Sequence, residues 1–543
     1  MANLWYKNAI IYCVDVKSFM DANGDGTGDF IGLADRLDHL ERLGVTCIWL
    51  NPFYPSPRRD NGYDISDYYG IDPDLGTLGD FVEFIHAAED RGMRVIVDLV
   101  VNHTSDQHPW FQAARSDPKS PFRDWYVWRD EKPDNAGDGI VFPGVQTSTW
   151  TYDQAAKAWY MHRFYRFQPD LNTTNPAVRA EILKIMGFWL ALGVSGFRVD
   201  AVPFLIEPRG VLTDKPVADP HAMLTEIHDF LSWRKAEAIL LAEANIRYED
   251  ADLYFAAGDR MTMVFDFVGN EQLFLSLSRQ TAAPLRRALA SRPEPGGMGQ
   301  WAVFLRNHDE LNLGGLTEQE RQDCFDAFGP EPRMQIYDRG LRRRLASMFD
   351  GDQARLKMAF SLLLALPGTP VIWYGDEIGM GEDLSLPERE AVRTPMQWSP
   401  RANGGFSDAP KSRLIRPVID KGKFGYSQVN AALETQHRDT FFHAVADMIS
   451  ARRSSPEIGW GGVDIIDIGD DEVLVLSSSW RGNRVITAHN FSNQPKTFHL
   501  KDEGIEEMMP MLTESPSGPM AGDDDISLSP YGYCWLRCNG ERR

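Results

Sequence analysis

The chain has 543 residues, 43% of them hydrophobic, so it is long enough for a large core and more than one domain. Its 56 basic and 78 acidic residues give a net charge of −22, which argues against nucleic acids as partners because their binding requires a basic surface. The five cysteines are scattered, the first residues do not follow a signal-peptide pattern, and no apolar run approaches the ~20 residues of a membrane span, so we expect a cytoplasmic protein without membrane partners.

Strands and helices alternate along the first hundred residues. Apolar runs at 9–16, 46–50 and 94–100 predict strands. Between them, 33–43 carries leucines on one helical face, and Thr77 stands where it can cap a second helix. This alternation predicts a parallel sheet covered by helices.

The alternation stops after Asn102, and residues 104–173, rich in Trp, Tyr, Pro and Asp and without a helical stripe, are predicted to be an inserted domain. It resumes at Asn175-Pro176, a helix cap followed by a proline in the first turn. Further strands are expected before Asp200, before Glu243, at 263–267, before Asp309 and at 371–374. Eight strand–helix units predict an α/β fold, a (β/α)8 TIM barrel built from residues 1–103 and 174–454.

Two regions differ from the barrel pattern. Residues 311–350 form a charged excursion, which we interpret as a solvated helical flap. From 455 to 543, short strands separated by turn signals such as Arg481-Gly482-Asn483 predict a C-terminal antiparallel β-sandwich domain. The sequence leaves open whether the chain forms a homo-oligomer.

Three acidic residues each follow an apolar run: Asp200 after GVSGFRV, Glu243 after AILLA and Asp309 after WAVFLRNH. The carboxyl ends of barrel strands are where barrel enzymes carry their catalytic groups, so these acids are expected to converge there. Converging carboxylates are typical of glycosidic bond cleavage, in which one acid donates a proton and one carboxylate attacks the sugar or stabilises its cation.

Four motifs in order, DLVVNH (98–103), GFRVD (196–200), the Glu243 segment and FLRNHD (304–309), resemble the signature regions of the α-amylase superfamily, glycoside hydrolase family 13. The segment QPDLN (168–172) resembles a fifth region. The resemblance implies that Asp200 is the nucleophile, that Glu243 is the acid and then the base, and that Asp309 fixes the 2- and 3-hydroxyls of the sugar.

The resemblance also implies a set of substrate-binding residues. Arg198 lies on the same strand face as Asp200, two residues earlier, where a charge-assisted hydrogen bond would keep the nucleophile ionised. In exo-acting relatives an aspartate and an arginine at the positions of Asp64 and Arg393 pair across the pocket floor and block longer chains. The full set is Tyr63, Asp64, His103, Arg198, His308 and Arg393.

The loop DANGDGTGD (21–29) carries oxygen-bearing residues at alternate positions, as the first half of a calcium-binding loop does. We expect a calcium ion there, with magnesium as the alternative, held by Asp21, Asn23, Asp25, Thr27 and Asp29. The resemblance implies a second calcium site between the inserted domain and the barrel, formed by Asn102, Asp170, Phe204, Leu205 and Glu207. No organic cofactor is expected.

Within the superfamily, the segments NPFYPSPRRDNGYDISDY, NHTSDQHPWF and VRTPMQWSP look most like trehalose synthases. The resemblance implies isomerisation of maltose to trehalose by intramolecular transglucosylation through a glucosyl-Asp200 intermediate. An exo-acting α-1,4-glucosidase that hydrolyses maltose, sucrose or related small α-glucosides is the alternative. A catalytically dead binding protein is the third hypothesis, and the presence of all three acids counts against it.

Overall fold

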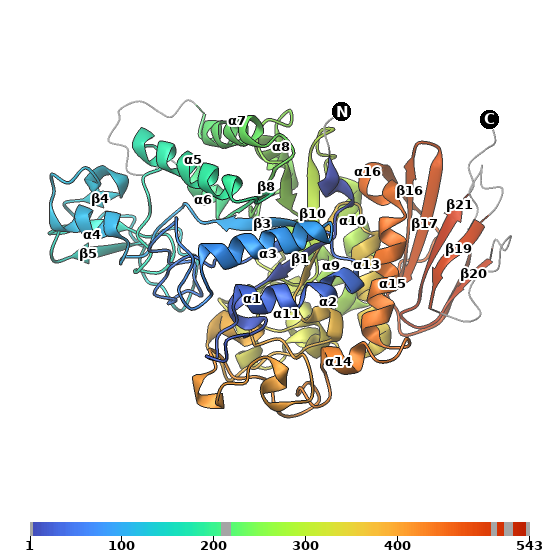
Figure 1. The fold of residues 1–543 in the computed structure, drawn as a ribbon. Helices are drawn as coiled ribbons and strands as arrows, with labels where there is room; N and C mark the ends of the chain where they lie inside the picture. The colour runs from blue at the N-terminus through green and yellow to red at the C-terminus, as the bar shows by residue number, and fades with distance from the viewer. Residues whose placement is uncertain (1–3, 208–218, 501–507, 515–524, 539–543) are drawn as a thin grey trace.

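Eight parallel strands close into a barrel at the centre of the molecule (Figure 1). The structure is a computed structural model that describes residues 4–207, 219–500, 508–514 and 525–538. The order around the barrel is β1-β14-β10-β9-β8-β7-β3-β2, so the predicted (β/α)8 fold is confirmed. These strands are β1 (Ile11–Val14), β2 (Cys47–Leu50), β3 (Arg94–Leu99), β7 (Gly196–Val199), β8 (Ile239–Ala242), β9 (Met263–Phe265), β10 (Gln300–Phe304) and β14 (Thr369–Trp373).

Helices surround the barrel, and the caps read from the sequence fix two of them. Thr77 forms a capping box with Asp80, and Asn175 caps the helix that begins at Pro176. The helix predicted over 33–43 is instead two helices that meet at Arg36. The longer helices around the barrel are α1 (Phe30–Asp35), α2 (Leu37–Leu43), α3 (Leu78–Asp90), α5 (Pro176–Ala191), α7 (Ala222–Arg234), α9 (Phe267–Arg279), α10 (Ala283–Ser291), α13 (Gln353–Ala365) and α15 (Phe441–Arg453); shorter ones are α6 (Val202–Leu205), α8 (Ala251–Phe255), α12 (Leu345–Met348), α14 (Ala431–Glu434) and α16 (Pro456–Trp460).

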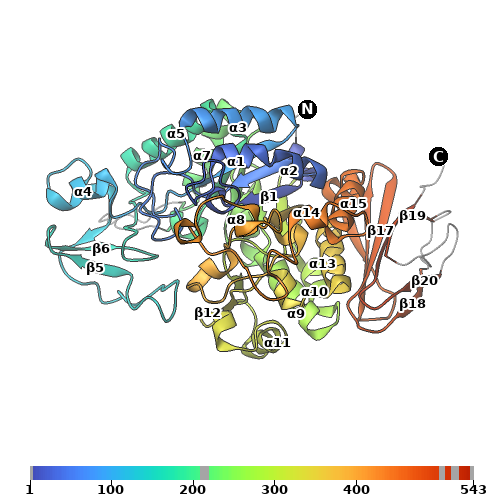
Figure 2. The ribbon, with the colours of Figure 1, turned by 60° about the horizontal axis from the view of Figure 1, so that its bottom comes forward.

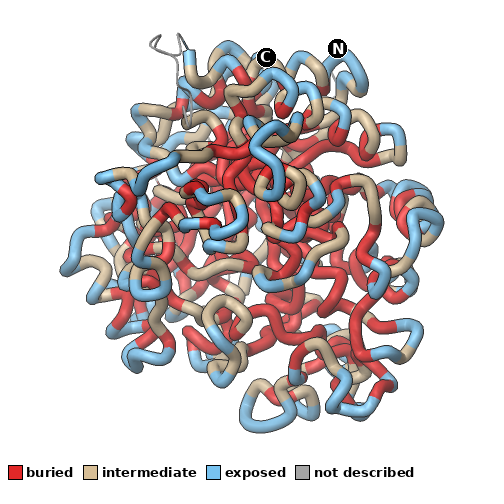
Figure 3. The backbone as a smooth tube through the Cα atoms, turned by 90° about the vertical axis from the view of Figure 1, so that its left-hand side faces the viewer, coloured by how far each residue is buried: buried red, intermediate tan, exposed pale blue. Residues whose placement is uncertain are grey.

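The barrel interior is the main hydrophobic core. Apart from Arg94 at the start of β3, every residue of the eight strands is buried, which accounts for their largely apolar sequences. Buried backbone gathers in the interior of the molecule and exposed backbone at its periphery (Figure 3). Trp49 and Trp373 are among the largest fully buried side chains. A rigid barrel of this kind holds the residues at its strand ends in fixed positions.

The segment between β3 and α5 projects from one side of the barrel (Figure 1). It contains a three-stranded antiparallel sheet of β4 (Trp128–Arg129), β6 (Ala158–Met161) and β5 (Trp150–Asp153). The sheet lies within the predicted inserted domain at 104–173. That segment also holds a helix that the sequence did not predict, α4 (Pro109–Ser116), capped by His108.

The excursion after β10 is more than a helical flap. It contains α11 (Glu318–Phe328), whose start is fixed by a capping box at Thr317 (Figure 2). It also contains a small sheet in the order β11-β13-β12, in which β11 (Leu311–Asn312) and β12 (Gln335–Ile336) both pair with β13 (Gly340–Leu341). The flap prediction therefore missed this sheet, which brings the tip of the excursion back to the barrel mouth.

The C-terminal region forms two antiparallel sheets, as predicted for a β-sandwich. The larger sheet has the order β15-β16-β17-β21-β19 and the smaller one pairs β18 with β20. Part of the larger sheet belongs to the barrel core, because Leu474, Leu476 and Trp535 pack in the same hydrophobic cluster, and Trp535 Nε1 donates to Ser361 Oγ of α13 at 2.9 Å. The strands are β15 (Gly462–Ile466), β16 (Val473–Trp480), β17 (Asn483–Asn490), β18 (Lys496–His499), β19 (Met508–Thr513), β20 (Asp525–Leu528) and β21 (Tyr533–Cys538).

Within the described residues, no helix has the length and apolar character needed to cross a membrane.

Candidate active site

The three predicted acids gather at the carboxyl ends of the barrel strands. Asp200 follows β7 directly and Glu243 follows β8 directly. Asp309 lies five residues beyond the end of β10, so it reaches the site on a loop rather than at a strand end. Arg306, buried in that loop, donates to the Asp309 backbone carbonyl at 2.7 Å and fixes its position.

Arg198 on β7 holds the acids together. Its Nη1 contacts Asp98 Oδ1 at 2.7 Å and Asp200 Oδ1 at 2.5 Å, and its Nη2 contacts Glu243 Oε2 at 3.0 Å. The guanidinium is 2% exposed, so these interactions are little screened by solvent. A second constraint on Glu243 comes from the backbone N–H of Ala201, which donates to Oε2 at 2.9 Å from a left-handed conformation with φ of 51°. One arginine therefore orients both the nucleophile and the acid that the sequence predicted.

Burial separates the acids into different protonation states. Loss of solvation raises the pKa of Asp200 to about 6, although Arg198 acts in the opposite direction. The pKa of Glu243 is raised further, to about 7, by burial and by the neighbouring charges of Asp200 and Asp309. Near neutral pH the proton shared by this coupled pair therefore resides mainly on Glu243, which suits it for the acid role and Asp200 for the nucleophile role. Arg198 was expected to keep Asp200 ionised, and it does lower the pKa of Asp200, but burial has the larger effect and the net shift is upward.

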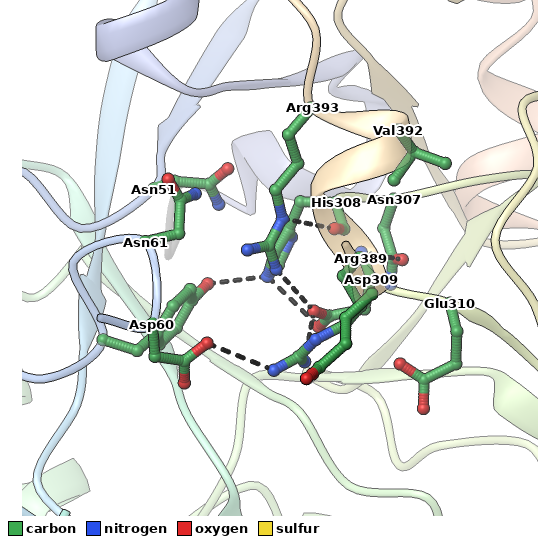
Figure 4. Close-up of polar contacts among 12 residues, drawn as sticks. Asn51, Asp60, Asn61, Asn307, His308, Asp309, Glu310, Arg389, Val392 and Arg393 are labelled. Atoms are coloured by element: carbon green, nitrogen blue, oxygen red, sulfur yellow. Dashed lines mark hydrogen bonds and ion pairs between the residues drawn. The ribbon is translucent and has the colours of Figure 1, made fainter. Parts of the chain in front are cut away.

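Asp309 is held ionised by two arginines and contacts a neighbouring histidine (Figure 4). Its Oδ1 contacts Arg389 Nη1 at 2.6 Å and Arg393 Nη2 at 3.0 Å, and its Oδ2 lies 3.2 Å from His308 Nε2. Burial opposes ionisation, but Arg389 and its neighbours prevail and lower the pKa of Asp309 well below its usual range. The pKa of the buried His308 is also lowered, so the imidazole is neutral.

Tyr63 and His103 line the floor of the site. The hydroxyl of Tyr63 lies 2.7 Å from His308 Nε2, and the two rings are stacked with centroids 5.5 Å apart. His103 Nε2 lies 3.2 Å from the backbone carbonyl of Tyr63, and burial lowers the pKa of this histidine. Both side chains face the cavity that Asp200 and Glu243 line, as their predicted roles require.

The predicted pair of Asp64 and Arg393 is wrong. Asp64 is fully buried and accepts hydrogen bonds from Ser56 and from backbone N–H groups of its own loop, while Arg393 contacts Glu390, Asp309 and the backbone carbonyl of His308.

The pair that crosses the pocket is Asp60 and Arg389, whose Oδ1 and Nη2 lie 3.3 Å apart (Figure 4). Each lies four residues before its predicted counterpart, and both line the cavity. The charge-rich segment EREAVR (388–393) was the available signal for Arg389.

Two cavities meet at the catalytic acids. An inner cavity of about 40 Å3 is lined by Asp60, Tyr63, His103, Phe164, Asp200, Glu243, Asp309 and Arg389. That volume is enough for a few water molecules, and the ion pair between Arg389 and Asp60 crosses this space. An outer cavity of about 480 Å3 shares Phe164, Glu243, Asp309 and Arg389 with it, and adds Phe142, Phe204, Phe267 and Arg339. Glu243 thus stands between the space for the attacked sugar and the space for its leaving group.

The first predicted metal loop has suitable donors but is closed by its own hydrogen bonds. The side chains of Asp21, Asn23, Asp25 and Asp29 each accept at least one backbone N–H of the loop, and Thr27 contributes one of those donors. Oxygen ligands suit calcium. Across the described residues, however, no three His, Cys, Asp or Glu side chains cluster closely enough to hold a metal ion. Calcium binding here therefore stays a prediction.

The second predicted metal site is assembled in part. Asn102 Nδ2 donates to Asp170 Oδ1 at 3.4 Å, whereas the buried Asn102 Oδ1 accepts no hydrogen bond from any described residue, as an oxygen that awaits a cation would do. Glu207 is paired with Arg163, and the Leu205 carbonyl accepts from a threonine hydroxyl. Phe204, the remaining predicted ligand, lines the outer cavity. This donor set fits a cation only at Asn102 and Asp170.

Comparison with known proteins agrees with this geometry. A family model described as the catalytic domain of alpha amylase matches residues 12–327 and 340–461. The chain belongs to the α-amylase family. The resemblance inferred from the sequence motifs is thereby confirmed.

Curated relatives narrow the comparison. The chain is 41% identical over 537 residues to a trehalose synthase of Thermus thermophilus. The aligned region covers 98% of this chain but only 55% of that protein. It is 42% identical over 549 residues to the trehalose synthase/amylase TreS of Mycolicibacterium smegmatis, covering 98% and 92%. An oligo-1,6-glucosidase of Parageobacillus thermoglucosidasius is 29% identical over 596 residues, covering 98% of both chains.

Solved structures share the whole architecture. A crystal structure of a trehalulose synthase MutB variant in complex with Tris has a TM-score of 0.80 and 30% identity, covering 98% of this chain and 100% of that one. A second MutB variant, in complex with the substrate sucrose, also has a TM-score of 0.80, with 29% identity over 99% and 100% of the chains.

Proposed function

We propose that the protein is a retaining α-glucosyl-transferring enzyme that isomerises maltose to trehalose. The observation that carries the proposal is the position of Glu243, which shares Arg198 with Asp200 and stands between the inner and outer cavities. The trehalose synthases at 41% and 42% identity support the choice of reaction, as does the likeness to trehalulose synthase structures.

The reaction has two steps. A carboxylate oxygen of Asp200 attacks carbon 1 of the glucosyl unit, Glu243 protonates the glycosidic oxygen, and the bond between carbon 1 and that oxygen breaks. The products are a glucosyl ester of Asp200 and a free glucose. Glu243, now a carboxylate, then takes the proton from the hydroxyl on carbon 1 of that glucose. The oxygen of that hydroxyl attacks carbon 1 of the bound glucosyl unit, and the bond between that carbon and Asp200 breaks. Every atom of maltose is retained, so water must be kept from the ester.

An exo-acting α-1,4-glucosidase is the second candidate function. It uses the same first step, but water attacks the ester and two glucose molecules leave. The likeness to oligo-1,6-glucosidases at 29% identity favours it, since those proteins share the whole length of the chain.

A product time course on maltose, trehalose and sucrose tests the proposal. We expect maltose to give mainly trehalose, with some free glucose. Glucose alone from maltose, with no trehalose at any time, would favour the glucosidase. If none of the three sugars reacts, the assigned substrate class is wrong.

We propose in addition that the loop at 21–29 binds calcium and that the protein works in the cytoplasm. The all-oxygen donor set supports calcium over a softer metal. No disulfide joins any of the five cysteines, all of which lie buried in the described part of the chain, and this supports a reducing compartment.

A further inference from the structure

Three loops from different barrel strands meet at the outer cavity. The first belongs to the inserted segment after β3 and carries Phe142 and Tyr165, the second is the excursion after β10 and carries Tyr337, and the third follows β14 and carries Glu388. The three loops are far apart in the sequence. Tyr165 and Tyr337 are 172 positions apart, and Tyr337 and Glu388 are 51 positions apart. Their contacts therefore join three separate loops beside the wall of the outer cavity.

The loops are joined by two tyrosines on one carboxylate. Tyr337 donates its hydroxyl to Glu388 Oε2 at 2.7 Å, and Tyr165 donates to the same oxygen. The two hydroxyls lie 3.4 Å apart. We call this group of three side chains the clasp. Hydrogen bonds to a charged acceptor are stronger than neutral ones, so the clasp is a specific connection rather than incidental contact.

Two of the three clasp residues, Tyr337 and Glu388, have strained backbone conformations. Tyr337 has a φ of 56° and Glu388 a φ of 39°, left-handed conformations that residues with a Cβ seldom adopt. Such conformations persist only where surrounding interactions hold them, and they concentrate at functional sites. The two strained residues contact each other through their side chains, so the clasp supplies an interaction that holds both turns.

The clasp is continuous with the catalytic cavity through Phe142. The buried ring of Phe142 lies 4.7 Å from the ring of Tyr165 and 4.9 Å from that of Tyr337. The Arg389 guanidinium lies 5.0 Å from the centroid of the same ring, and Arg389 in turn contacts Asp60 and Asp309. Phe142 and Arg389 both line the outer cavity. Opening the clasp would therefore loosen the wall against which the leaving glucose rests.

We infer that the clasp of Tyr165, Tyr337 and Glu388 decides how the glucosyl ester is divided between glucose and water, because it holds the wall of the outer cavity in place while the released glucose turns. The inference rests on the proposed isomerase function. These residues touch neither the ester nor the acids, so they are positioning residues. Their loss is expected to leave the attack of Asp200 intact and to change only what reacts next.

The test uses the full-length enzyme with Tyr165→Phe, Tyr337→Phe and the double variant. Each change removes one hydroxyl and keeps the ring that packs on Phe142. Losing a hydrogen bond to a charged group should lower the ratio of closed to open mouth about tenfold, so hydrolysis relative to isomerisation of maltose should rise about tenfold. Release of an aryl group from an aryl α-glucoside should stay within about twofold of the wild-type rate, since that step reports attack by Asp200.

Tyr69→Phe is the matched control. Its hydroxyl donates to Glu181 Oε1 at 2.8 Å, the same type of bond, but neither residue lines a catalytic cavity. This variant should leave the product ratio unchanged. Unchanged ratios in both clasp variants would overturn the inference, as would an equal change in the control.

Hydrogen–deuterium exchange gives a readout that does not depend on the reaction. Both clasp variants should exchange faster than wild type in residues 139–146 and 331–341, and the control should not. If the wild type makes no trehalose, the proposed function fails, and exchange alone then decides the clasp: faster exchange in those two segments supports it, and wild-type exchange refutes it.

Discussion

Because Asp98 and Asp200 contact the same nitrogen of Arg198, a change at Asp98 should shift the acid limb of the pH profile of kcat/KM. With pKa values of about 6 for Asp200 and about 7 for Glu243, the active form peaks near pH 6.5 and falls roughly sevenfold by pH 5 and by pH 8. The acid limb reports protonation of Asp200, and the alkaline limb reports loss of the proton from Glu243. We therefore expect a bell-shaped profile of kcat/KM for maltose.

Asp98→Asn should move only the acid limb. Asp98 raises the pKa of Asp200 and also competes for Arg198 Nη1, so its removal lowers the pKa of Asp200 by both routes. Because both carboxylates contact the same nitrogen, their oxygens are at most about 5.2 Å apart, the sum of 2.7 and 2.5 Å. At that distance two full charges interact by about 3 kcal/mol at an effective dielectric constant near 20, so the largest shift expected for the pKa of Asp200 is about two units.

The assay is kcat/KM for maltose in the wild type and the variant from pH 4.5 to 8.5, with each profile normalised to its own maximum. A lower acid limb means that activity survives to lower pH, since the nucleophile stays ionised there. The reasoning is refuted if the acid limb stays in place, or if the alkaline limb moves as far as the acid limb does. Thermal unfolding at each pH checks that the variant stays folded over the range.

Two further predictions concern the acids and the metal loop. Asp200→Asn should abolish turnover and keep the fold. Glu243→Gln should still form the glucosyl ester from a substrate with a good leaving group, and mass spectrometry should detect that ester. Maltose turnover near the wild-type rate in either variant would contradict the roles assigned to these residues. Native mass spectrometry in calcium without chelator should find a bound ion that is lost in Asp25→Ala. Circular dichroism should stay unchanged, because the hydrogen bonds that Asp21 and Asn23 accept within the loop remain in this variant. Wild-type protein without any divalent ion would exclude the site.

Local sequence determined much of the barrel and the two acids at its strand ends. An apolar run closing on Asp200 or Glu243 specifies both the strand and the place of its carboxylate, and Thr77 and Asn175 specify helix starts by their own side chains. Asp309 was located less well, because four loop residues separate it from β10 and Arg306 sets its position.

Ion pairs between residues of distant loops could not be predicted from local sequence. Asp60 and Asp64 are both acidic, and Arg389 and Arg393 are both basic, so composition and spacing fit either pairing. The choice depends on how two loops fold against each other: Asp64 turns back to its own loop, which leaves Asp60 to face Arg389. The clasp was not predicted for the same reason. Its three residues come from three loops, and no local sequence pattern indicates that these loops meet.

The continuity of the barrel core with the C-terminal sheet has a consequence for cooperativity. Leu474, Leu476 and Trp535 belong to the same apolar cluster as the barrel strands, and Trp535 is anchored on α13. A boundary drawn near 455 thus divides the sequence but not the hydrophobic core. Removing the C-terminal strands would expose to water the face of α13 that Trp535 contacts, so we expect the barrel and the C-terminal sheets to unfold in a single transition.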